Sequence, residues 1–392
     1  MKIYIVLNEP FPNGMACTAR ITLYAKGFIE QGIPVQILIP RATEKYNSKI
    51  NKDTLGDKDG INFRYFSAST LRSKTFIRRR IDDFTSILKT FFFLITNIKK
   101  KDVLLVVSND VPHILICKCT SLLVGNKLFQ EKSEFPLIFI RDTFLNKLYK
   151  KLYINSIYKL FDGIIVISES LKEYLQTKTR NNCRFLVVPI IVDLNQFNQN
   201  QQNIRLTNEI VYAGALNQTK DGILNLVNSF DQFSNKNKTK RLVLMGDINA
   251  SDSKDEIYEL ISKKKLEDKI EITGYIEREE MIKRMKCADT LVLSKPSNLQ
   301  SQHCFPTKLG EYLATGKPVV ITRVGPVDLY FKDSLNAFIA EPDDIDSFTS
   351  KLNKVYNDYD KALAVGKEGK KVAKYNFDYI KNTASIIEFF KD

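Results

Sequence analysis

The segment 301–321 constrains the fold more than any other stretch of the chain, because it predicts a loop, a short helix and a buried strand in immediate succession. Pro306 suits the first turn of the helix, where its missing N–H costs nothing, and Thr307 can help to cap that turn. Gly316 and Pro318 end the helix, and the apolar run at 319–321 predicts the strand. Such a succession is typical of α/β proteins.

The start of this predicted helix is suited to an anionic group. Its first N–H groups have no helical partners and form the positive end of the helix dipole, and Lys308 stands beside them. Glu311 follows one turn later, where its carboxylate can accept hydrogen bonds from a pair of sugar hydroxyls. A phosphate site next to a diol acceptor indicates a pocket for a nucleotide sugar. The alternative interpretation is an ordinary loop, helix and strand without a ligand.

Length and composition indicate two domains and an anionic partner. A chain of 392 residues is too long for a single core, and its net charge of +14 points to nucleic acid, anionic lipid or a phosphorylated substrate. Six scattered cysteines and two histidines give no metal-ligand spacing, so we expect no metal site and a reducing, cytoplasmic compartment. The N-terminus predicts a strand and not a signal peptide, and the longest apolar run is too short to span a bilayer.

The first part of the chain predicts a doubly wound α/β domain. A strand at 1–8 leads into a Pro- and Gly-rich turn that contains Gly14, followed by a helix that ends near Gly32 and a second strand at 35–39. The stretch 193–202 is rich in Asn and Gln and lacks an apolar period, so it predicts the linker to the second domain.

Residues 71–101 are strongly basic, with nine Lys and Arg against two acids, interleaved with aromatic and aliphatic side chains. One interpretation is a solvated helix with a core-facing stripe. A second, which we favour, is an amphipathic segment that lies on an anionic membrane surface. Nucleic acid is a third option, but no nucleic-acid-binding motif accompanies the charge, so we expect no such partner.

Strands that end in glycine recur in the second half of the chain. The run 209–213 ends at Gly214, and Lys220 follows six residues later. Gly214 lets the backbone approach a pyrophosphate, and Lys220 can neutralise that group as a point charge. Two later strands end in similar glycine turns, one at Gly246 and one just before Ile276.

The helix segment resembles the donor-binding segment of the group 1 glycosyltransferases of family 4, which have the GT-B fold. The order Pro306-x-Lys308-x-x-Glu311 is similar to a common variant of their motif, in which two glutamates are separated by seven residues. Glu311 matches the second glutamate. His303 stands at the position of the first, so the sequence departs from the family where the donor sugar is held.

A second resemblance lies in the spacing of Gly214 and Lys220, which matches the family, although Ala215 replaces an expected arginine. The resemblance implies an α/β fold of two Rossmann-like domains that face a central cleft. It implies an acceptor-side domain over 1–193, a nucleotide-sugar-binding domain over 207–375, and a C-terminal helix over 376–392 that crosses back to the first domain.

The resemblance also implies which residues form the site. The lysines would hold the diphosphate, Glu311 the ribose and the backbone of Ile276 the base. The donor-binding set comprises Gly14, Gly214, Lys220, Gly246, Ile276, Phe305, Pro306, Thr307, Lys308 and Glu311. Family members usually carry a histidine near the strand end at which this sequence has Glu131 and Glu134, so these two acids and His303 are the candidate catalytic residues.

The implied function is transfer of a sugar from a nucleotide diphosphate sugar with retention of configuration, without a metal and without a cofactor other than the donor. Together with the basic first domain, it predicts a glycan or lipid-linked acceptor in surface polysaccharide synthesis. The protein would then be cytoplasmic and peripheral on the inner face of the cell membrane. Two alternatives stay open: a weak or inactive relative that binds nucleotide and membrane, and a nucleotide-sugar epimerase.

Overall fold

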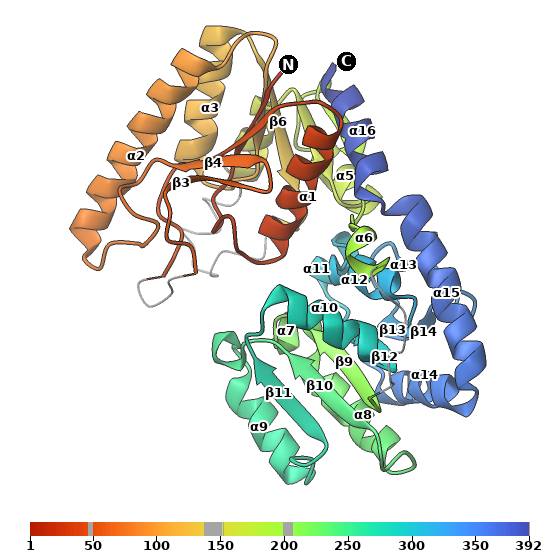
Figure 1. Cartoon of the computed structure of the whole chain (residues 1–392). Coiled ribbons are helices and arrows are strands. Elements are labelled where there is room, and N and C mark those ends of the chain that lie inside the picture. The colour runs from red at the N-terminus through yellow and green to blue at the C-terminus, as the bar shows by residue number, and fades with distance from the viewer. Residues whose placement is uncertain (46–49, 137–150, 152, 199–206, 392) are drawn as a thin grey trace. The chain divides into compact units, whose positions relative to one another are not determined.

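The computed structural model describes residues 1–45, 50–136, 151, 153–198 and 207–391. The chain forms two compact units (Figure 1). Unit 1 consists of Met1–Pro189 together with Tyr379–Asp392, and unit 2 consists of Ile190–Asp378. Each unit is built on its own sheet, and the final helix of the chain belongs to unit 1.

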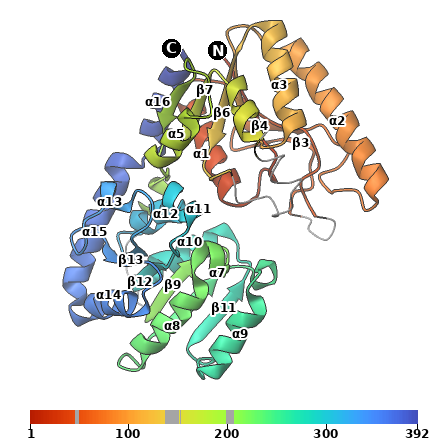
Figure 2. The same cartoon turned by 180° about the vertical axis from the view of Figure 1, so that it is seen from behind.

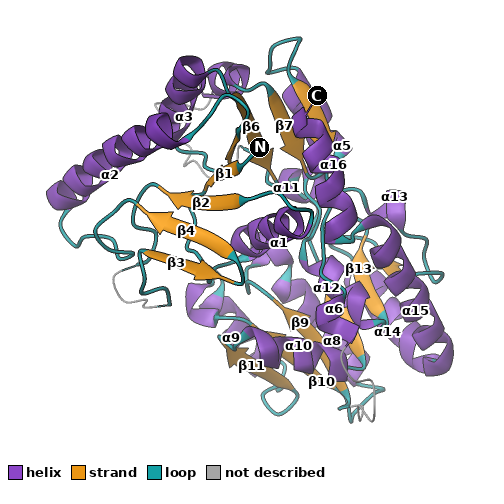
Figure 3. Ribbon diagram, turned by 45° about the horizontal axis from the view of Figure 1, so that its top comes forward, coloured by secondary structure: helices purple, strands orange, loops and turns teal. Residues whose placement is uncertain are grey.

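The sheet of unit 1 has the order β3-β4-β2-β1-β5-β6-β7-β8 among the described residues. Its neighbouring strands are parallel except for the β3–β4 pair at one edge (Figure 3). The central strands are short apolar runs buried on both faces, as parallel sheets require. Its strands are β1 (Ile3–Val6), β2 (Val35–Ile39), β3 (Leu55–Lys58), β4 (Ile61–Tyr65), β5 (Val103–Val106), β6 (Lys127–Lys132), β7 (Gly163–Val166) and β8 (Arg184–Val187).

Helices cover this sheet, and the last of them comes from the end of the chain. Helix α16 packs along α1, as both Figure 1 and Figure 2 show. Phe390 lies against Phe129 of β6, with ring centroids 4.7 Å apart. The helices of this unit with described bounds are α1 (Ala16–Glu30), α2 (Phe76–Asn97), α3 (Val111–Val124), η1 (Ile157–Leu160), α5 (Glu169–Gln176) and α16 (Tyr379–Lys391).

The sheet of unit 2 is parallel throughout its described strands and has the order β11-β10-β9-β12-β13-β14. The strand order reverses between β9 and β12, and in open α/β sheets ligands bind at such a reversal, beyond the carboxyl ends of the strands. The strands are β9 (Glu209–Ala213), β10 (Arg241–Met245), β11 (Ile270–Gly274), β12 (Thr290–Leu293), β13 (Val319–Thr322) and β14 (Phe338–Ala340).

The helices of unit 2 bury apolar stripes against its sheet. In α8, Leu226, Phe230 and Phe233 follow helical spacing and join one buried cluster with Phe348 and Leu352 of α14. The helices are α6 (Asn195–Asn198), α7 (Gln218–Asp221), α8 (Ile223–Ser234), η2 (Ile248–Ala250), α9 (Lys254–Lys263), α10 (Arg278–Cys287), α11 (Leu299–His303), α12 (Lys308–Thr315), α13 (Val327–Tyr330), α14 (Ile345–Asn357) and α15 (Tyr359–Asn376).

The predicted α/β architecture with two Rossmann-like sheets is confirmed, with three local differences. Residues 301–303 are helical and not a loop, because Asn298 and Ser301 form a capping box that starts α11. Helix α12 begins at Lys308, and the Thr307 side chain makes no capping hydrogen bond. Within the predicted linker, 195–198 form α6, whereas 199–206 lie outside the described residues.

No helix in the described part of the chain is both long enough and apolar enough to cross a bilayer.

The close packing of α1 on α16 depends on Gly27. A Cβ at this position would lie 2.3 Å from Oγ1 of Thr383. Alanine is favoured over glycine inside a helix by up to about 1 kcal/mol, but overpacking costs about 1–3 kcal/mol. We therefore expect Gly27→Ala to lower the free energy of unfolding by about 1 kcal/mol in urea denaturation. Adding Thr383→Ala should restore part of the loss, and a single variant more stable than the parent chain would contradict this packing.

Candidate active site

Glycines line the carboxyl ends of neighbouring strands in unit 2. Gly214 follows β9 with a φ of +147°, a backbone conformation that side chains disfavour. A Cβ on Gly246, which follows β10, would lie 2.0 Å from the carbonyl oxygen of Gly214. Gly246 in turn forms a bridge to Gly274 at the end of β11. This edge of the sheet therefore exposes backbone where other residues would place side chains.

Lys308 occupies the space that Gly214 leaves open. Its Nζ would lie 1.8 Å from a Cβ on Gly214, so any other residue at 214 would displace the ammonium group. Nζ donates to the Tyr212 hydroxyl at 2.7 Å and lies 4.5 Å from the centroid of the Tyr212 ring. The first residue of α12 is thus fixed directly over the end of β9.

Asp221 is the anionic partner of this lysine. Its Oδ1 accepts from Lys308 Nζ at 3.2 Å and from Lys295 Nζ at 3.4 Å, while its side chain is 2% exposed. Lys295 also donates to the Lys220 carbonyl at 2.8 Å. Asp221 Oδ2 is buried, and none of the described residues forms a hydrogen bond with it. Lys308 and Lys295 thus contact one carboxylate, the charge of Lys220 also acts on it, and the cluster carries an excess of positive charge.

Burial and neighbouring charges have opposite effects on the pKa of Asp221, and also on the pKa of Lys308. Burial would raise the pKa of Asp221, but Lys308 and Lys295 outweigh burial and leave that pKa below its ordinary value. Burial lowers the pKa of Lys308 to about 8, although the Asp221 carboxylate raises it. An anion that binds beside Lys308 would supply a second negative partner and stabilise its charged form.

Two contacts hold the start of α12 at this position. The backbone N–H of Ala213, the last residue of β9, donates to the Tyr312 hydroxyl at 2.7 Å. Leu309, Tyr312 and Leu313 are buried on the inner face of the helix. The N-terminal N–H groups of α12, Lys308 and the glycine edge of the sheet therefore come together at the reversal of strand order.

Glu311 lies on the accessible side of the same helix turn. Its side chain is 21% exposed and accepts a hydrogen bond from Arg278 of α10, with Nη2 2.8 Å from Oε1. The same Arg278 nitrogen lies 2.9 Å from Oε1 of Gln196. Arg278 thus orients the carboxylate that the sequence predicts to hold the ribose.

The other predicted donor residues lie around this centre. Lys220 is near the end of α7 and contributes to the charge around Lys308, and Ile276 is half-buried between β11 and α10. The Phe305 side chain is buried and stacks on Tyr330 at 5.3 Å, so only its backbone is available to a ligand.

Three further candidates lie at the start of α12 and at the end of α11. Pro306 is buried, and its carbonyl accepts from the Leu309 N–H at 3.0 Å. Thr307 is half-buried directly before α12, and His303 is the last residue of α11 and is also half-buried. The role of His303 toward the donor sugar stays a prediction.

In unit 1, the structure places Glu131 in a buried ion pair. Arg20 Nε donates to Glu131 Oε1 at 2.9 Å, and both side chains are 3% exposed. The remaining guanidinium nitrogens of Arg20 donate to the carbonyls of Pro189 and Val188, each at 2.7 Å. Arg20 therefore joins α1 to Glu131 of β6 and to the backbone that follows β8.

Glu134 and Gly14 lie in loops beyond the strands of unit 1. Glu134 is half-buried shortly after β6, and burial together with Glu134 raises the pKa of Glu9 after β1. Gly14 precedes α1, and a Cβ there would lie 2.3 Å from Oγ1 of Thr18. The catalytic roles of Glu131 and Glu134 stay predictions.

Several residues in and around the lysine cluster were not predicted from the sequence. Asp221 adjoins Lys220 and Lys295 follows β12, so a search for charged residues just beyond predicted strands could have found both. Arg278 and Tyr212 carry no such signal, because one lies on an exposed helix and the other inside a buried strand. No group of three or more His, Cys, Asp or Glu residues suited to a metal ion occurs in the described ranges.

Comparison with known proteins gives the class of this fold. Residues 195–372 match the family model of the glycosyl transferases group 1, and this range lies within unit 2. No curated protein matches the sequence significantly.

Solved structures resemble the chain over its whole length. The sucrose-phosphate synthase of Thermosynechococcus elongatus has a TM-score of 0.77 at 14% identity, with 100% of this chain and 98% of that chain covered. Anabaena HepE in complex with UDP has a TM-score of 0.73 at 14% identity, with 100% of both chains covered. The pneumococcal O-GlcNAc transferase GtfA in complex with UDP and GlcNAc has a TM-score of 0.69 at 12% identity, with 100% of this chain and 98% of that chain covered.

The fold is therefore that of the GT-B glycosyltransferases. Residues 195–372 of the second unit match the glycosyl transferases group 1, and the chain as a whole shares the fold of solved glycosyltransferases. The predicted resemblance to group 1 is confirmed.

The buried ion pair of Arg20 and Glu131 predicts a structural role for Glu131, which the stability of a variant can test. Removing one partner of a buried ion pair costs about 3–5 kcal/mol, because the other charge is left uncompensated. We expect Glu131→Gln to lower the free energy of unfolding by at least about 2 kcal/mol in urea denaturation, since glutamine keeps one hydrogen bond. The matched variant Glu134→Gln, at a half-buried loop position, should change it by less than about 1 kcal/mol. Equal stability of both variants would show that the ion pair contributes little.

Proposed function

We propose that this protein is a retaining, metal-independent glycosyltransferase of family 4 that uses a nucleotide diphosphate sugar as donor. The observation that carries the proposal is the cluster of Lys220, Lys295 and Lys308 around Asp221, placed at the helix start and the glycine edge of the group 1 domain. Three cations and a helix dipole can stabilise a leaving diphosphate without a divalent ion.

In the proposed reaction, Lys308 and the N–H groups of α12 bind the diphosphate, while Glu311, oriented by Arg278, accepts hydrogen bonds from the ribose hydroxyls. The bond between the anomeric carbon and the diphosphate oxygen breaks, and the acceptor oxygen bonds to the same face of that carbon. The acceptor proton passes to an oxygen of the leaving phosphate. The lysines lower the barrier because they stabilise the charge that develops on the leaving group.

We further propose that the acceptor is a membrane-associated glycan or lipid-linked sugar in surface polysaccharide synthesis. The protein would then be cytoplasmic and bound to the inner face of the cell membrane. The net charge of +14 and the basic segment 71–101 support this proposal, because both favour an anionic surface. Since HepE and GtfA are in complex with UDP, UDP is the first nucleotide to test.

The donor site can be tested by thermal-shift and calorimetric titration with UDP, GDP, ADP and CMP. We expect one diphosphate to bind and the binding to be unchanged by EDTA. Glu311→Ala should weaken it about 10- to 100-fold, because hydrogen bonds to a charged acceptor contribute about 1.5–3 kcal/mol. Glu368→Ala, an exposed acid on α15, is the matched control and should bind as the parent chain does. Binding that is equal in the Glu311 and Glu368 variants would remove Glu311 from the site.

A second test separates the enzyme from a non-catalytic relative. Incubation with the matching nucleotide sugar should release free sugar slowly even without an acceptor, and Lys308→Ala should lower this rate by at least about 100-fold. Nucleotide binding without any such turnover would favour the non-catalytic relative.

The low pKa of Lys308 predicts a pH dependence of donor binding. The free-state pKa is about 8, and a bound diphosphate raises it, so binding takes up a proton wherever free Lys308 is neutral. Affinity should therefore be constant well below pH 8 and fall as pH rises through 8, by up to about tenfold per pH unit. Isothermal calorimetry between about pH 7 and 9 measures this slope. Lys308→Arg keeps its charge throughout this range and should flatten the slope. An unchanged slope in that variant would assign the proton to another group.

A further inference from the structure

Helix α2 of unit 1 exposes an apolar face along most of its length. Ile77, Ile81, Phe84, Leu88 and Phe92 follow one another at intervals of three or four residues, so they share one side of the helix. Their side chains are 73%, 57%, 63%, 40% and 59% exposed, respectively. A surface helix ordinarily turns such residues inward.

The opposite side of α2 is packed against the rest of unit 1, so the helix has a defined inner face. The buried residues of α2 are Ser86, Thr90 and Leu94, two of which are small and polar. Ser86 and Thr90 donate to carbonyls one turn earlier in α2, at 2.6 Å and 2.8 Å. The helix therefore buries two small polar residues together with Leu94 and leaves several large apolar side chains outside.

The neighbouring helix α3 repeats this pattern. It packs beside α2, as Figures 1 and 2 both show. Leu115, Leu122 and Leu123 of α3 are 46%, 72% and 70% exposed. Two adjacent helices that both expose aliphatic or aromatic side chains are characteristic of a surface that docks onto something apolar.

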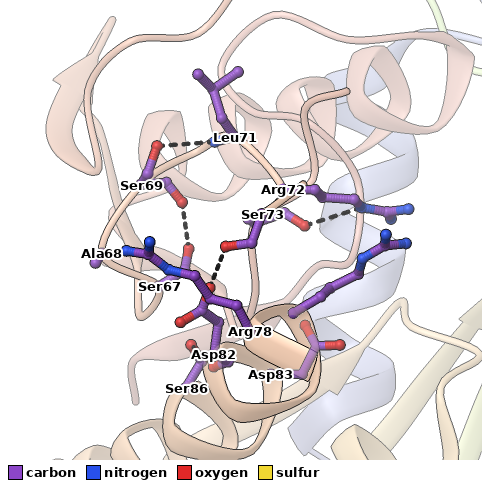
Figure 4. Close-up of a pocket in the computed structure, with 12 residues that line it drawn as sticks. Ser67, Ala68, Ser69, Leu71, Arg72, Ser73, Arg78, Asp82, Asp83 and Ser86 are labelled. Carbon is purple, nitrogen blue, oxygen red and sulfur yellow. Dashed lines mark hydrogen bonds between the residues drawn. The ribbon is translucent and has the colours of Figure 1, made fainter. Parts of the chain in front are cut away.

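The exposed charges of α2 are all positive. Arg78, Arg79, Arg80 and Lys89 are exposed, whereas Asp82 and Asp83 are half-buried. Asp82 accepts a hydrogen bond from the Ser73 hydroxyl, so it is turned toward the preceding loop (Figure 4). The apolar face is thus bordered by cations and not by acids.

A hollow at the start of α2 adds polar groups to this end of the surface. It has a volume of about 100 Å³ and is lined by the arginines 72, 78 and 79, by four serines and by Asp82 and Asp83 (Figure 4). A second hollow of about 500 Å³ adjoins it, and its described lining consists of Lys45, Arg72, Ser73, Lys74 and Arg79. Arginine, lysine and serine side chains of this kind bind phosphate oxygens.

We propose that α2 and α3 form a docking surface for an anionic lipid bilayer. Helix α2 lies in the plane of the interface with its apolar face among the acyl chains. The hollow lined by Lys45, Arg72, Lys74 and Arg79 then receives lipid phosphates at the level of the head groups. This inference deepens the membrane part of the proposed function and does not depend on the sugar transferred.

Charge complementarity favours a bilayer over a second copy of the chain. In a two-fold symmetric dimer the same patch meets itself, so two surfaces whose exposed α2 charges are all positive would face each other. Such like charges repel, and no exposed acid on α2 compensates them. An anionic bilayer offers both an apolar interior and opposite charge.

The chain contains no tryptophan, so a single introduced indole reports on this surface alone. Phe84→Trp places the reporter on the apolar face of α2, and Tyr258→Trp on α9 of unit 2 serves as the control. With vesicles of phosphatidylcholine and phosphatidylglycerol, we expect a blue shift and quenching by brominated lipid for Phe84→Trp only. An unshifted Phe84→Trp spectrum at vesicle concentrations that bind the protein would overturn the proposal.

Two variants then separate insertion from electrostatic adsorption. Phe84→Ser with Phe92→Ser, and Arg78→Gln with Arg79→Gln, should each lower vesicle partitioning in flotation by at least about tenfold. Leu335→Ser, at a 55% exposed leucine of unit 2, should not. A loss in the arginine variant alone would reduce the surface to adsorption and contradict insertion.

Sedimentation and nucleotide binding complete the test. A dimer of the parent chain that dissociates in the double serine variant would assign the face to a second copy and overturn the proposal. The nucleotide that binds in the titration of the donor site should bind equally to both double variants and to the parent chain, which also shows that the variants fold. Failure of vesicle binding with intact nucleotide binding would reject the docking surface alone, whereas a parent chain that binds none of the four nucleotides would reject the donor site.

Discussion

The site depends on the close contact between Gly214 and Lys308. The lysine ammonium lies where a side chain at position 214 would have to be, so backbone and cation share the end of β9 only because that residue is glycine. A second contact fixes α12 at the same place, because the hydroxyl of Tyr312 accepts a hydrogen bond from the backbone N–H of Ala213, one residue before Gly214. The contact between Gly246 and Gly214 extends this backbone edge to β10. The absence of a side chain at Gly214 thus allows the start of α12 to approach the carboxyl end of β9.

The sequence predicts this region well because the signals are local. Glycines after buried strands, a proline before a helix and a glycine after it are constraints that act within a few residues. They predict the α/β architecture and the resemblance to group 1. Asp221, Lys295 and Arg278 are different, because their importance comes from partners 87, 74 and 33 residues away in the chain. Only the fold brings those partners together.

Unit 1 shows a second reason why parts of the structure could not be predicted from the sequence. The spacing of apolar residues in α2 predicts an amphipathic helix, but it cannot say which side faces inward. The structure turns Ser86 and Thr90 toward the unit and leaves Phe84 and Phe92 outside. Similarly, Glu131 looks like an accessible acid at the end of a strand, yet Arg20 from a distant helix neutralises it in the interior. Orientation and pairing of this kind are settled by tertiary packing.

Asp221 has a consequence for turnover. Its buried carboxylate already neutralises part of the charge of Lys308 and Lys295 when no ligand is present. In the proposed donor site, a diphosphate that enters would compete with this carboxylate for the lysines, and the carboxylate would remain as their partner when the diphosphate leaves. The cluster would then hold a product less tightly than lysines without an acidic partner would. Asp221 would thereby lower the affinity of the lysines for the product, so that the lysines could stabilise the leaving phosphate and still release it.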